Sequence, residues 1–375
     1  MKQFVLATSL LVGTIVGAGI FSLPFVFSQA GIVGGILFGV VVALIAICVL
    51  LMYADLILDD HSEHRIMGLA RYYFGKKGFF SLLFVNGLGT LFVLTTYIVL
   101  SVSFLKIFFT HTPFLILALL FWLISFWAIF LRIKNEAQLE FFATIGIGLV
   151  IVMILGFGLS HLEEFSLSFS PFSPFLFILP IGAFLFSLGG RAVIPDVVAF
   201  LGEEKKKVRQ VISTGVFVSL ALYFVFVIGV VSMSDVITQD GVSGLVKLPW
   251  NVQVIMGVLG IFALWSSFIS NGSDLFRSFR HDVGLSRIAA GALVSLIPIV
   301  LVFVGFDDFL MLVSIVGGLF LAVEWSSIVM MWIAMRKKKP QEVSVLGNVG
   351  PSVLVVIFLV LCIAIVYTIY TTLFF

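Results

Sequence analysis

The chain has 375 residues, of which 61% are hydrophobic and 11% are charged, and its formal net charge is +2. About 25% of residues are charged in an average soluble domain, so this chain has too few charged side chains to cover a soluble globule of its size. The composition excludes a soluble enzyme, a secreted domain and a disordered chain, and the low net charge gives no basis for nucleic-acid binding.

Eleven segments of the sequence are long and apolar enough to cross a bilayer as helices, which takes about 20 mostly apolar residues. We therefore predict an all-α polytopic membrane protein with 11 transmembrane helices that forms a single transmembrane domain over residues 1–375. In chain order, the spans are predicted at about 4–28, 31–58, 79–105, 112–131, 138–160, 175–201, 209–232, 250–272, 286–305, 308–334 and 351–374.

The basic residues of the predicted loops set the orientation of the chain. With the N-terminus inside, the inner segments hold 18 of the 21 Lys and Arg residues, the outer loops hold Lys106 and Lys247, and Arg191 lies within a span. Cytoplasmic loops of membrane proteins carry an excess of Lys and Arg. We therefore expect a multi-pass protein of the plasma membrane, with a cytoplasmic N-terminus and an extracytoplasmic C-terminus.

The first predicted span contains a break in its middle. The run from Gly13 to Pro24 reads GTIVGAGIFSLP, with three glycines within seven residues and a proline after them. In a helix interior, glycine costs about 1 kcal/mol and proline about 3 kcal/mol relative to alanine. Lipid offers no hydrogen bonds to the backbone groups that such a break frees, so the break is tolerated only where it lines a cavity.

The sixth predicted span repeats this feature in the opposite direction through the membrane. Its run from Ser187 to Pro195 reads SLGGRAVIP, and in both breaks the proline follows a glycine by five positions. Paired broken helices in two oppositely oriented halves point to an inverted-repeat transporter with a binding site at the breaks. Close packing of small residues between helices is the alternative explanation of the glycines.

The two runs resemble helices of a known transporter family. The run at 13–24 is similar to the first helix of amino acid permeases, and Gly189-Gly190 with Val193-Ile194-Pro195 is similar to the sixth helix of the amino acid/auxin permease branch and of bacterial aromatic amino acid permeases. That branch belongs to the amino acid–polyamine–organocation superfamily. The resemblance implies the leucine-transporter-type five-plus-five inverted repeat with the first and sixth helices broken.

Applied to this chain, the resemblance implies repeat halves of about 4–160 and 175–334, with an extra C-terminal helix at 351–374. It also implies a secondary active transporter, symporter or exchanger, that moves amino acids by alternating access. The apolar cavity walls favour a neutral or aromatic amino acid. The alternatives are a transporter of another small amine or organic solute, against which Arg191 argues when the substrate is cationic, and a channel.

An enzyme is not expected, because the sequence has no nucleophile elbow, no HExxH motif and no phosphate-binding loop. The expected partners are a small-molecule substrate and the lipid bilayer. Neither a cofactor, a nucleic acid nor an obligate protein partner is expected.

An unwound helix offers groups for both ends of an amino acid zwitterion. Backbone N–H groups at the start of a half-helix suit a carboxylate, and unpaired carbonyls at the end of the preceding half-helix suit an ammonium group. The family pattern places the carboxylate at the N–H groups of Ala18, Gly19 and Ile20, and the amine near the carbonyls of Thr14, Ile15, Phe186 and Ser187. The predicted substrate-binding residues are Thr14, Gly17, Ala18, Gly19, Ile20, Tyr97, Phe186, Ser187, Gly189, Gly190 and Arg191.

Arg191 is a charged residue inside a span, directly after the second break. An Arg at the membrane centre costs about 2.5–3.5 kcal/mol on insertion scales, and such charges mark functional sites. Three roles are open: Arg191 pairs with Glu324 or Asp196, contacts an anionic substrate group, or replaces a coupling ion. Glu324 in the tenth span is the candidate proton carrier, with a structural ion pair as the alternative. Asp55 and Asp274 are expected at cytoplasmic helix ends, within reach of water.

Sodium is the other candidate coupling ion. The resemblance places Na⁺ between carbonyls of the first span and hydroxyls of the eighth, and hard cations take oxygen ligands. The predicted ligands are the hydroxyls of Ser266 and Ser267 and carbonyls of Gly13 or Val16 and Ala263. The alternative interpretation is that these serines bond back to the carbonyl four residues earlier, as they do in many membrane helices.

Overall fold

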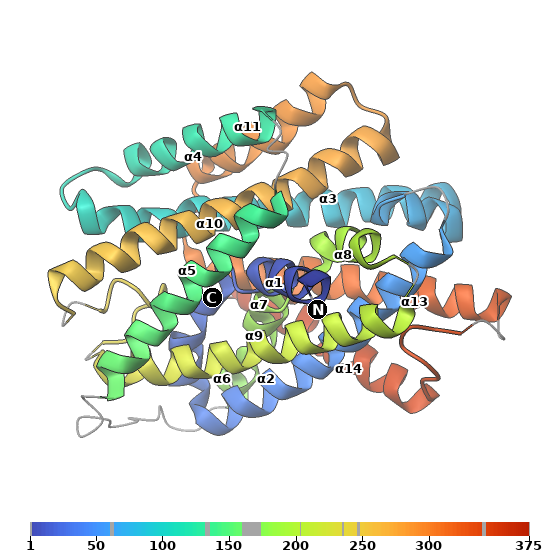
Figure 1. Cartoon of the computed structure of the whole chain (residues 1–375), viewed down its shortest axis with the longest axis horizontal. Coiled ribbons are helices and arrows are strands. Elements are labelled where there is room, and N and C mark those ends of the chain that lie inside the picture. Colours follow the sequence, from blue (N-terminus) through green and yellow to red (C-terminus); the bar gives the residue numbers. More distant parts are fainter. Residues whose placement is uncertain are drawn as a thin grey trace.

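The computed structural model of the protein is helical in the parts of the chain that it describes. Figure 1 shows the helices packed side by side, most of them with axes close to one common direction. Lys247 and the last residue of the predicted span 138–160 lie outside the described residues. The described residues are 2–60, 64–131, 136–159, 174–202, 204–234, 236–245, 248–339 and 343–374.

Within these ranges, nine helical segments are long and apolar enough to cross a membrane, and two shorter apolar helices accompany them. The short helix Gln3–Ile15 and the start of the following helix together form the first span. The second short helix, Phe114–Trp127, matches the predicted fourth span. The described helices therefore account for the eleven predicted spans.

The first half of the chain forms spans one to five. Gly31, with φ at 78°, separates the first span from the second within one long helix, and Gly75, with φ at 68°, divides the next helix in the same way. Positive φ is accessible to glycine at little cost. The helices are α1 (Lys2–Ile15), α2 (Gly19–Asp59), α3 (Ile66–Phe108), α4 (Phe114–Leu131) and α5 (Glu136–Leu159).

The second half forms spans six to ten, followed by the eleventh. A 3-10 turn, Arg191–Val193, interrupts the sixth span, and a π-helical turn, Val316–Leu321, interrupts the tenth. The helices are α6 (Pro174–Ile178), α7 (Pro180–Ser187), α8 (Ile194–Leu201), α9 (Lys205–Met233), α10 (Trp250–Ser278), α11 (Arg287–Val304), α12 (Phe309–Ile315), α13 (Ala322–Lys338) and α14 (Pro351–Phe374).

Local sequence signals explain where several of these helices begin and end. The side chain of Ser286 accepts a hydrogen bond from the N–H of Ala289, and Asp308 accepts one from the N–H of Met311, so each caps the helix that follows. Such caps satisfy backbone donors that have no partner inside the helix. α11 ends at Gly305, whose φ of 107° is a conformation that favours glycine.

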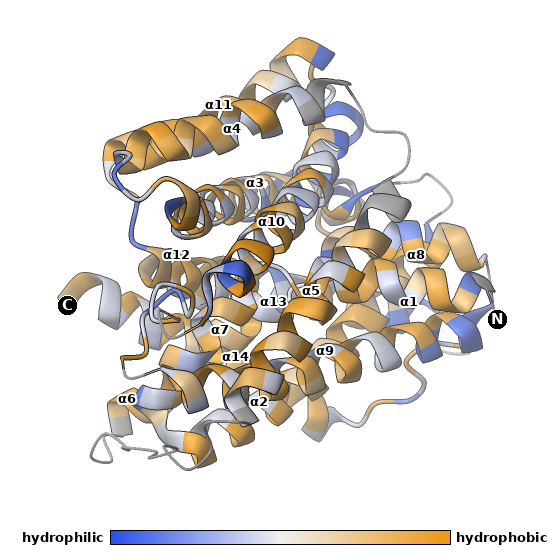
Figure 2. Ribbon diagram, turned by 60° about the vertical axis from the view of Figure 1, so that its left-hand side comes forward, coloured by the Kyte–Doolittle hydropathy of each residue, from blue (hydrophilic) through white to orange (hydrophobic). Residues whose placement is uncertain are grey.

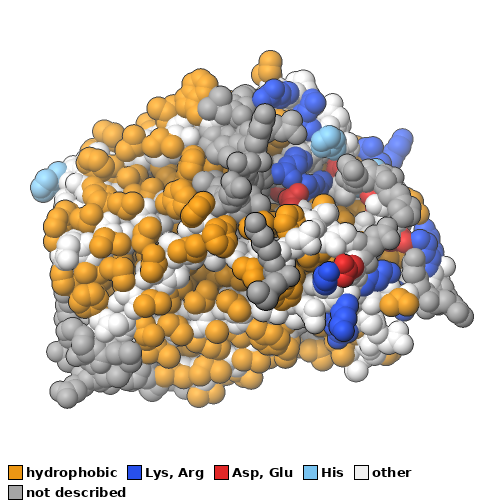
Figure 3. All heavy atoms as spheres, viewed as in Figure 1, with side chains coloured by type: hydrophobic (Ala, Val, Ile, Leu, Met, Phe, Trp, Pro, Cys, Tyr) orange, Lys and Arg blue, Asp and Glu red, His pale blue; other side chains and the backbone are white. Residues whose placement is uncertain are grey.

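Charged side chains gather at one end of the bundle, and apolar side chains cover most of the rest of the visible face (Figure 3). Figure 2 shows peripheral helices such as α4 and α11 as mostly hydrophobic ribbons. Soluble monomers rarely expose apolar patches larger than a few hundred Å², so this surface fits contact with lipid. We call the charged region the basic end. Arg65 and Arg277 both pair there with Asp196, Lys339 pairs with Asp59 at the end of α2, and Lys205 at the start of α9 donates to the carbonyl of Val343.

Helices from both halves surround the broken spans. α1 packs against α5, α8 and α9, and α7 packs against α2 and the π-helical turn of the tenth span. α10 lies against both α3 and α5. Figure 1 shows α1 and α7 in the middle of the bundle, so the two breaks lie in its interior.

Candidate functional site

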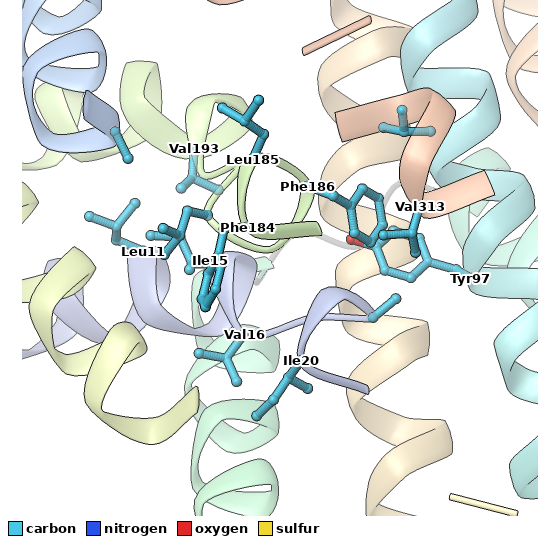
Figure 4. Packing of buried hydrophobic residues seen from close by; sticks show 14 of the residues in the cluster. Leu11, Ile15, Val16, Ile20, Tyr97, Phe184, Leu185, Phe186, Val193 and Val313 are labelled. Carbon is cyan, nitrogen blue, oxygen red and sulfur yellow. The ribbon is translucent and has the colours of Figure 1, made fainter. Parts of the chain in front are cut away.

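The two helix breaks are in direct contact. Residues 16–18 separate α1 from α2, and residues 188–190 separate α7 from the 3-10 turn. A Cβ atom built on Gly19 would lie 2.5 Å from the Cα of Ser187, and one built on Gly190 would lie 2.6 Å from Cγ1 of Ile15. At Gly19, only glycine allows the two backbones to approach this closely, and at Gly190, only glycine leaves room for the Ile15 side chain. Figure 4 shows the apolar side chains that pack around this crossing, with Ile15, Val16 and Phe184 near its centre.

A small cavity lies beside the crossing. Its volume is about 40 Å³, which holds a few water molecules at most. An amino acid side chain therefore requires the aromatic rings of the wall, those of Tyr97, Phe186 and Phe320, to move apart. Of the predicted substrate-binding residues, Thr14, Gly17, Ala18, Gly19, Tyr97, Phe186, Gly189 and Arg191 line this cavity. Ile20, Ser187 and Gly190 are buried outside its lining.

The backbone at the breaks presents both N–H donors and carbonyl acceptors. The N–H groups of Gly19 and Ile20 have no acceptor within their own helix because they lie at the start of α2, whereas the N–H of Phe21 donates to the carbonyl of Ala18 at 3.2 Å. The carbonyl of Ile15, at the end of α1, accepts from the N–H of Gly17 at 2.9 Å and from the hydroxyl of Tyr223 at 2.8 Å. Since a carbonyl has two lone pairs, Ile15 has no capacity left for an ammonium group. The Ser187 carbonyl also lies 2.5 Å from the Tyr223 hydroxyl.

Arg191 is buried, with 5% of its surface exposed, and it lies between two carboxylates. Its Nε is 2.6 Å from Oε1 of Glu324, and its Nη2 donates to Oδ2 of Asp274 at 2.9 Å. The second oxygen of Glu324 accepts from Nδ2 of Asn86 at 2.6 Å. Asp196, the other acid considered as a partner, pairs instead with Arg277 at 3.0 Å.

Asp274 links the cavity to the basic end. Its Oδ1 accepts from Nη1 of Arg65 at 3.0 Å, while its other oxygen accepts from Arg191. Arg65 in turn lies 3.5 Å from Asp196, which also pairs with Arg277. A chain of six charges of alternating sign, which we call the charge chain, therefore runs from the cavity to the basic end. Its members are Glu324, Arg191, Asp274, Arg65, Asp196 and Arg277.

The expectation that water reaches Asp55 and Asp274 is wrong. They are 5% and 3% exposed, respectively. Asp55 accepts hydrogen bonds from the indole N–H of Trp332 at 2.9 Å and from the N–H of Val345 at 2.6 Å. The error arose because the helices continue beyond the apolar runs: α10 extends to Ser278, so Asp274 lies inside a packed helix.

Ser266 and Ser267 are fully buried, and neither hydroxyl has a hydrogen-bond partner among the described residues. They therefore do not bond back to their own helix, which was the alternative interpretation of their role. A Cβ atom on Gly17 would lie 3.2 Å from Oγ of Ser267, so this hydroxyl lies against the first break. The predicted carbonyl ligands on Gly13, Val16 and Ala263 belong to residues that are also buried.

The hydroxyl of Tyr97 accepts a hydrogen bond from Nδ2 of Asn271 at 3.3 Å. Both residues line the cavity. Asn271, Asn86 and Phe320 were missed as site residues from sequence. The signal for Asn271 was its place one turn after Ser267 on the same helix; Asn86 and Phe320 lie in apolar runs without a local pattern.

The sequence matches the profile of the tryptophan/tyrosine permease family over residues 1–368. No curated protein matches the chain. Among solved structures, MhsT in complex with L-phenylalanine is 15% identical, with a TM-score of 0.72 over 99% of this chain and 97% of that one.

Two other solved structures are similar. A manganese transporter of Eremococcus coleocola is 14% identical, with a TM-score of 0.69 over 97% of this chain and 85% of that one. Mhp1, a nucleobase-cation-symport-1 family transporter with bromovinylhydantoin bound in a closed conformation, is 14% identical, with a TM-score of 0.65 over 99% and 91% of the two chains. These likenesses show the leucine-transporter-type inverted-repeat fold.

Substituting Asp274 tests the charge chain. Asp274→Asn keeps the shape of the side chain but leaves the buried Arg191 and the partly buried Arg65 without their shared carboxylate, so the free energy of unfolding should fall by about 3–5 kcal/mol. The measurement is denaturant unfolding of the purified protein in detergent. Asp196→Asn is the control, because this side chain is 39% exposed and its loss should cost about 1 kcal/mol or less. Equal losses in both variants would contradict the assignment.

Substituting Gly19 tests the contact between the breaks. Gly19→Ala places a methyl group against the backbone of Ser187 and should destabilise the fold by about 1–3 kcal/mol, as overpacking does. Gly156→Ala on α5 is the matched control, since a Cβ atom there meets nothing within 4 Å. Thermal unfolding of both purified variants is the measurement, and a neutral Gly19→Ala would show that the breaks do not touch.

Proposed function

The chain belongs to the tryptophan/tyrosine permease family, and we propose that its substrate is an aromatic amino acid. The family and the fold are those of secondary transporters in membranes, and not of enzymes. The observation that carries the proposal is the cavity at the crossing of the two breaks, which combines backbone polar groups with an aromatic wall. Aromatic rings pair favourably in edge-to-face or offset arrangements, which suits a substrate with an aromatic side chain.

The backbone at the breaks suits an amino acid zwitterion. We place the carboxylate at the N–H groups of Ala18, Gly19 and Ile20, where the start of α2 also contributes the positive end of a helix dipole. The amine was expected at four carbonyls, but the carbonyl of Ile15 is fully used and that of Ser187 is already engaged. The carbonyl of Phe186 likewise accepts from the N–H groups of Leu188 and Gly189, so the carbonyl of Thr14, whose residue lines the cavity, is the proposed acceptor.

The charge chain supports alternating access. It joins the sixth span, through Arg191 and Asp196, to the eighth span, through Asp274 and Arg277. Opening the bundle at the basic end requires the sixth span to move away from the eighth, and these ion pairs must then separate. We propose that the basic end faces the cytoplasm and that the charge chain holds that side closed.

A labelling experiment tests this orientation. Single cysteines at Lys338 and Asp307, both exposed, would be introduced after Cys48 and Cys362 are replaced by Ala. A membrane-impermeant maleimide added to intact cells should label the cysteine at 307 but not the one at 338, because basic segments stay inside. Labelling of both after permeabilisation is the control, and the reverse pattern in intact cells would overturn the orientation.

The coupling ion has two candidates. The buried hydroxyls of Ser266 and Ser267 lack partners, and an unsatisfied buried polar group costs about 1–3 kcal/mol, which a bound Na⁺ would offset. Glu324 faces the cavity and is paired with Arg191, so protonation of Glu324 would release Arg191. The first arrangement supports sodium coupling, and the second supports proton coupling.

Uptake into proteoliposomes tests the substrate and the coupling ion together. We expect labelled tryptophan, tyrosine and phenylalanine to accumulate when a Na⁺ or a pH gradient is imposed, and lysine and glutamate not to accumulate. The aromatic wall and the neutral total charge of the charge chain are the physical reasons. Accumulation of lysine but of no aromatic amino acid would contradict the proposed substrate class.

Matched variants then separate the two coupling ions. If Na⁺ drives uptake, Ser267→Ala should abolish the uptake that a Na⁺ gradient drives, and Glu324→Gln should retain this uptake. The control is Ser295→Ala, which also removes a buried hydroxyl without a partner among the described residues but lies on α11, away from the breaks. If a pH gradient drives uptake, Glu324→Gln should lose accumulation, and Ser267→Ala should keep it.

A further inference from the structure

Tyr223 on α9 connects the two breaks, although it belongs to neither broken span. Its side chain is fully buried. The hydroxyl oxygen lies 2.8 Å from the carbonyl oxygen of Ile15 and 2.5 Å from that of Ser187. Tyr223 does not line the cavity, so its contacts are with the backbone of the site and not with the space for substrate.

Ile15 and Ser187 are the last residues of α1 and α7, respectively. Carbonyls at the end of a helix have no donor within that helix, and the end carries about half a negative charge from the aligned peptide dipoles. Two such ends meet here, inside a bundle whose surroundings offer no water. The crossing therefore requires a positive group or a hydrogen-bond donor between the two carbonyls.

A tyrosine hydroxyl has one proton, so it donates to one carbonyl at a time. The hydroxyl lies within hydrogen-bond distance of both carbonyls, so its one proton serves the ends of the two half-helices in turn. A neutral phenol also adds no charge to a site that must accept a zwitterion. An ammonium group or a metal ion between the two carbonyls would add a positive charge.

We propose that Tyr223 is a positioning residue of the transport site: its hydroxyl occupies the point between the two half-helix ends that a cation would otherwise take. It thereby fixes the spacing of the breaks and directs the substrate ammonium group to the carbonyl on the cavity side, that of Thr14. This inference rests on the proposed function, because it specifies how the same site receives the amine of the substrate.

The first test is the transport kinetics of Tyr223→Phe in proteoliposomes. Removing the hydroxyl should raise KM for the aromatic amino acid at least tenfold, which corresponds to about 1.4 kcal/mol, with little change in the maximal rate per folded protein. Ser219→Ala is the matched control: it removes another fully buried hydroxyl from α9, one that bonds only to Gly215 of the same helix. An unchanged KM in Tyr223→Phe would overturn the proposal, and so would an equal rise in Ser219→Ala.

The second test needs no substrate. Without the hydroxyl, the two carbonyl ends can accept a small cation, so Na⁺ or K⁺ should raise the thermal stability of purified Tyr223→Phe more than that of the wild type, relative to choline at equal ionic strength. A sodium effect at Ser266 and Ser267 is common to both proteins and cancels in this comparison. Identical cation responses would contradict the inference.

The two tests also separate the inference from the proposed function. If the wild type takes up no aromatic amino acid, the substrate proposal fails, and the cation comparison still decides the role of Tyr223. If Tyr223→Phe does not fold, Tyr223→His and Tyr223→Leu replace it. The His variant keeps a donor and the Leu variant does not, so folded yield should be higher for His, and equal yields would overturn the proposal.

Discussion

The structure depends on one constraint: backbone N–H and C=O groups inside a bilayer must find partners within the protein. Interrupting a helix at mid-membrane frees several of these groups at once. Here two interruptions are placed against each other, with Gly19 allowing contact with the backbone of Ser187 and Gly190 making room for the Ile15 side chain. The freed carbonyls of Ile15 and Ser187 meet the hydroxyl of Tyr223, while the N–H groups at the start of α2 remain for a ligand. The proposed binding site is thus the part of the crossing whose backbone groups find no partner within the protein.

The same reasoning explains how Arg191 is tolerated inside a span. A buried charge is acceptable when it is paired and hydrogen-bonded, and Arg191 has one carboxylate on each side. Because Asp274 is shared with Arg65, the pairing continues outward until it reaches the partly exposed Asp196. Each ion pair holds together elements from different spans, so the charges that allow Arg191 to be buried also join the sixth span to the eighth.

Much of this arrangement followed from sequence, because local patterns encode it. Long apolar runs gave the spans, and the two glycine–proline runs marked the breaks, since both features act within about 20 residues. Glu324 was anticipated as a partner of Arg191 because each is a rare charge in an apolar run. Asp274 was misplaced, since hydropathy ends the eighth span at residue 272 whereas α10 packs as far as Ser278. Tyr223 left no signal, because its partner Ile15 is 208 residues away and tyrosine is unremarkable in an apolar helix.

The net charge of the site determines how substrate transport responds to the membrane potential. Glu324, Arg191, Asp274 and Arg65 sum to zero, and a zwitterion also carries no net charge, so substrate alone can enter without leaving a buried charge unpaired. For the same reason, moving substrate alone gains nothing from the membrane potential, which acts with about 2.3 kcal/mol per elementary charge per 100 mV. A cation that enters with the substrate couples transport to that potential. Either proposed cation, a proton on Glu324 or Na⁺ at Ser266 and Ser267, would bind next to a network that is otherwise neutral, and its added charge would favour the rearrangement of the ion pairs at the basic end.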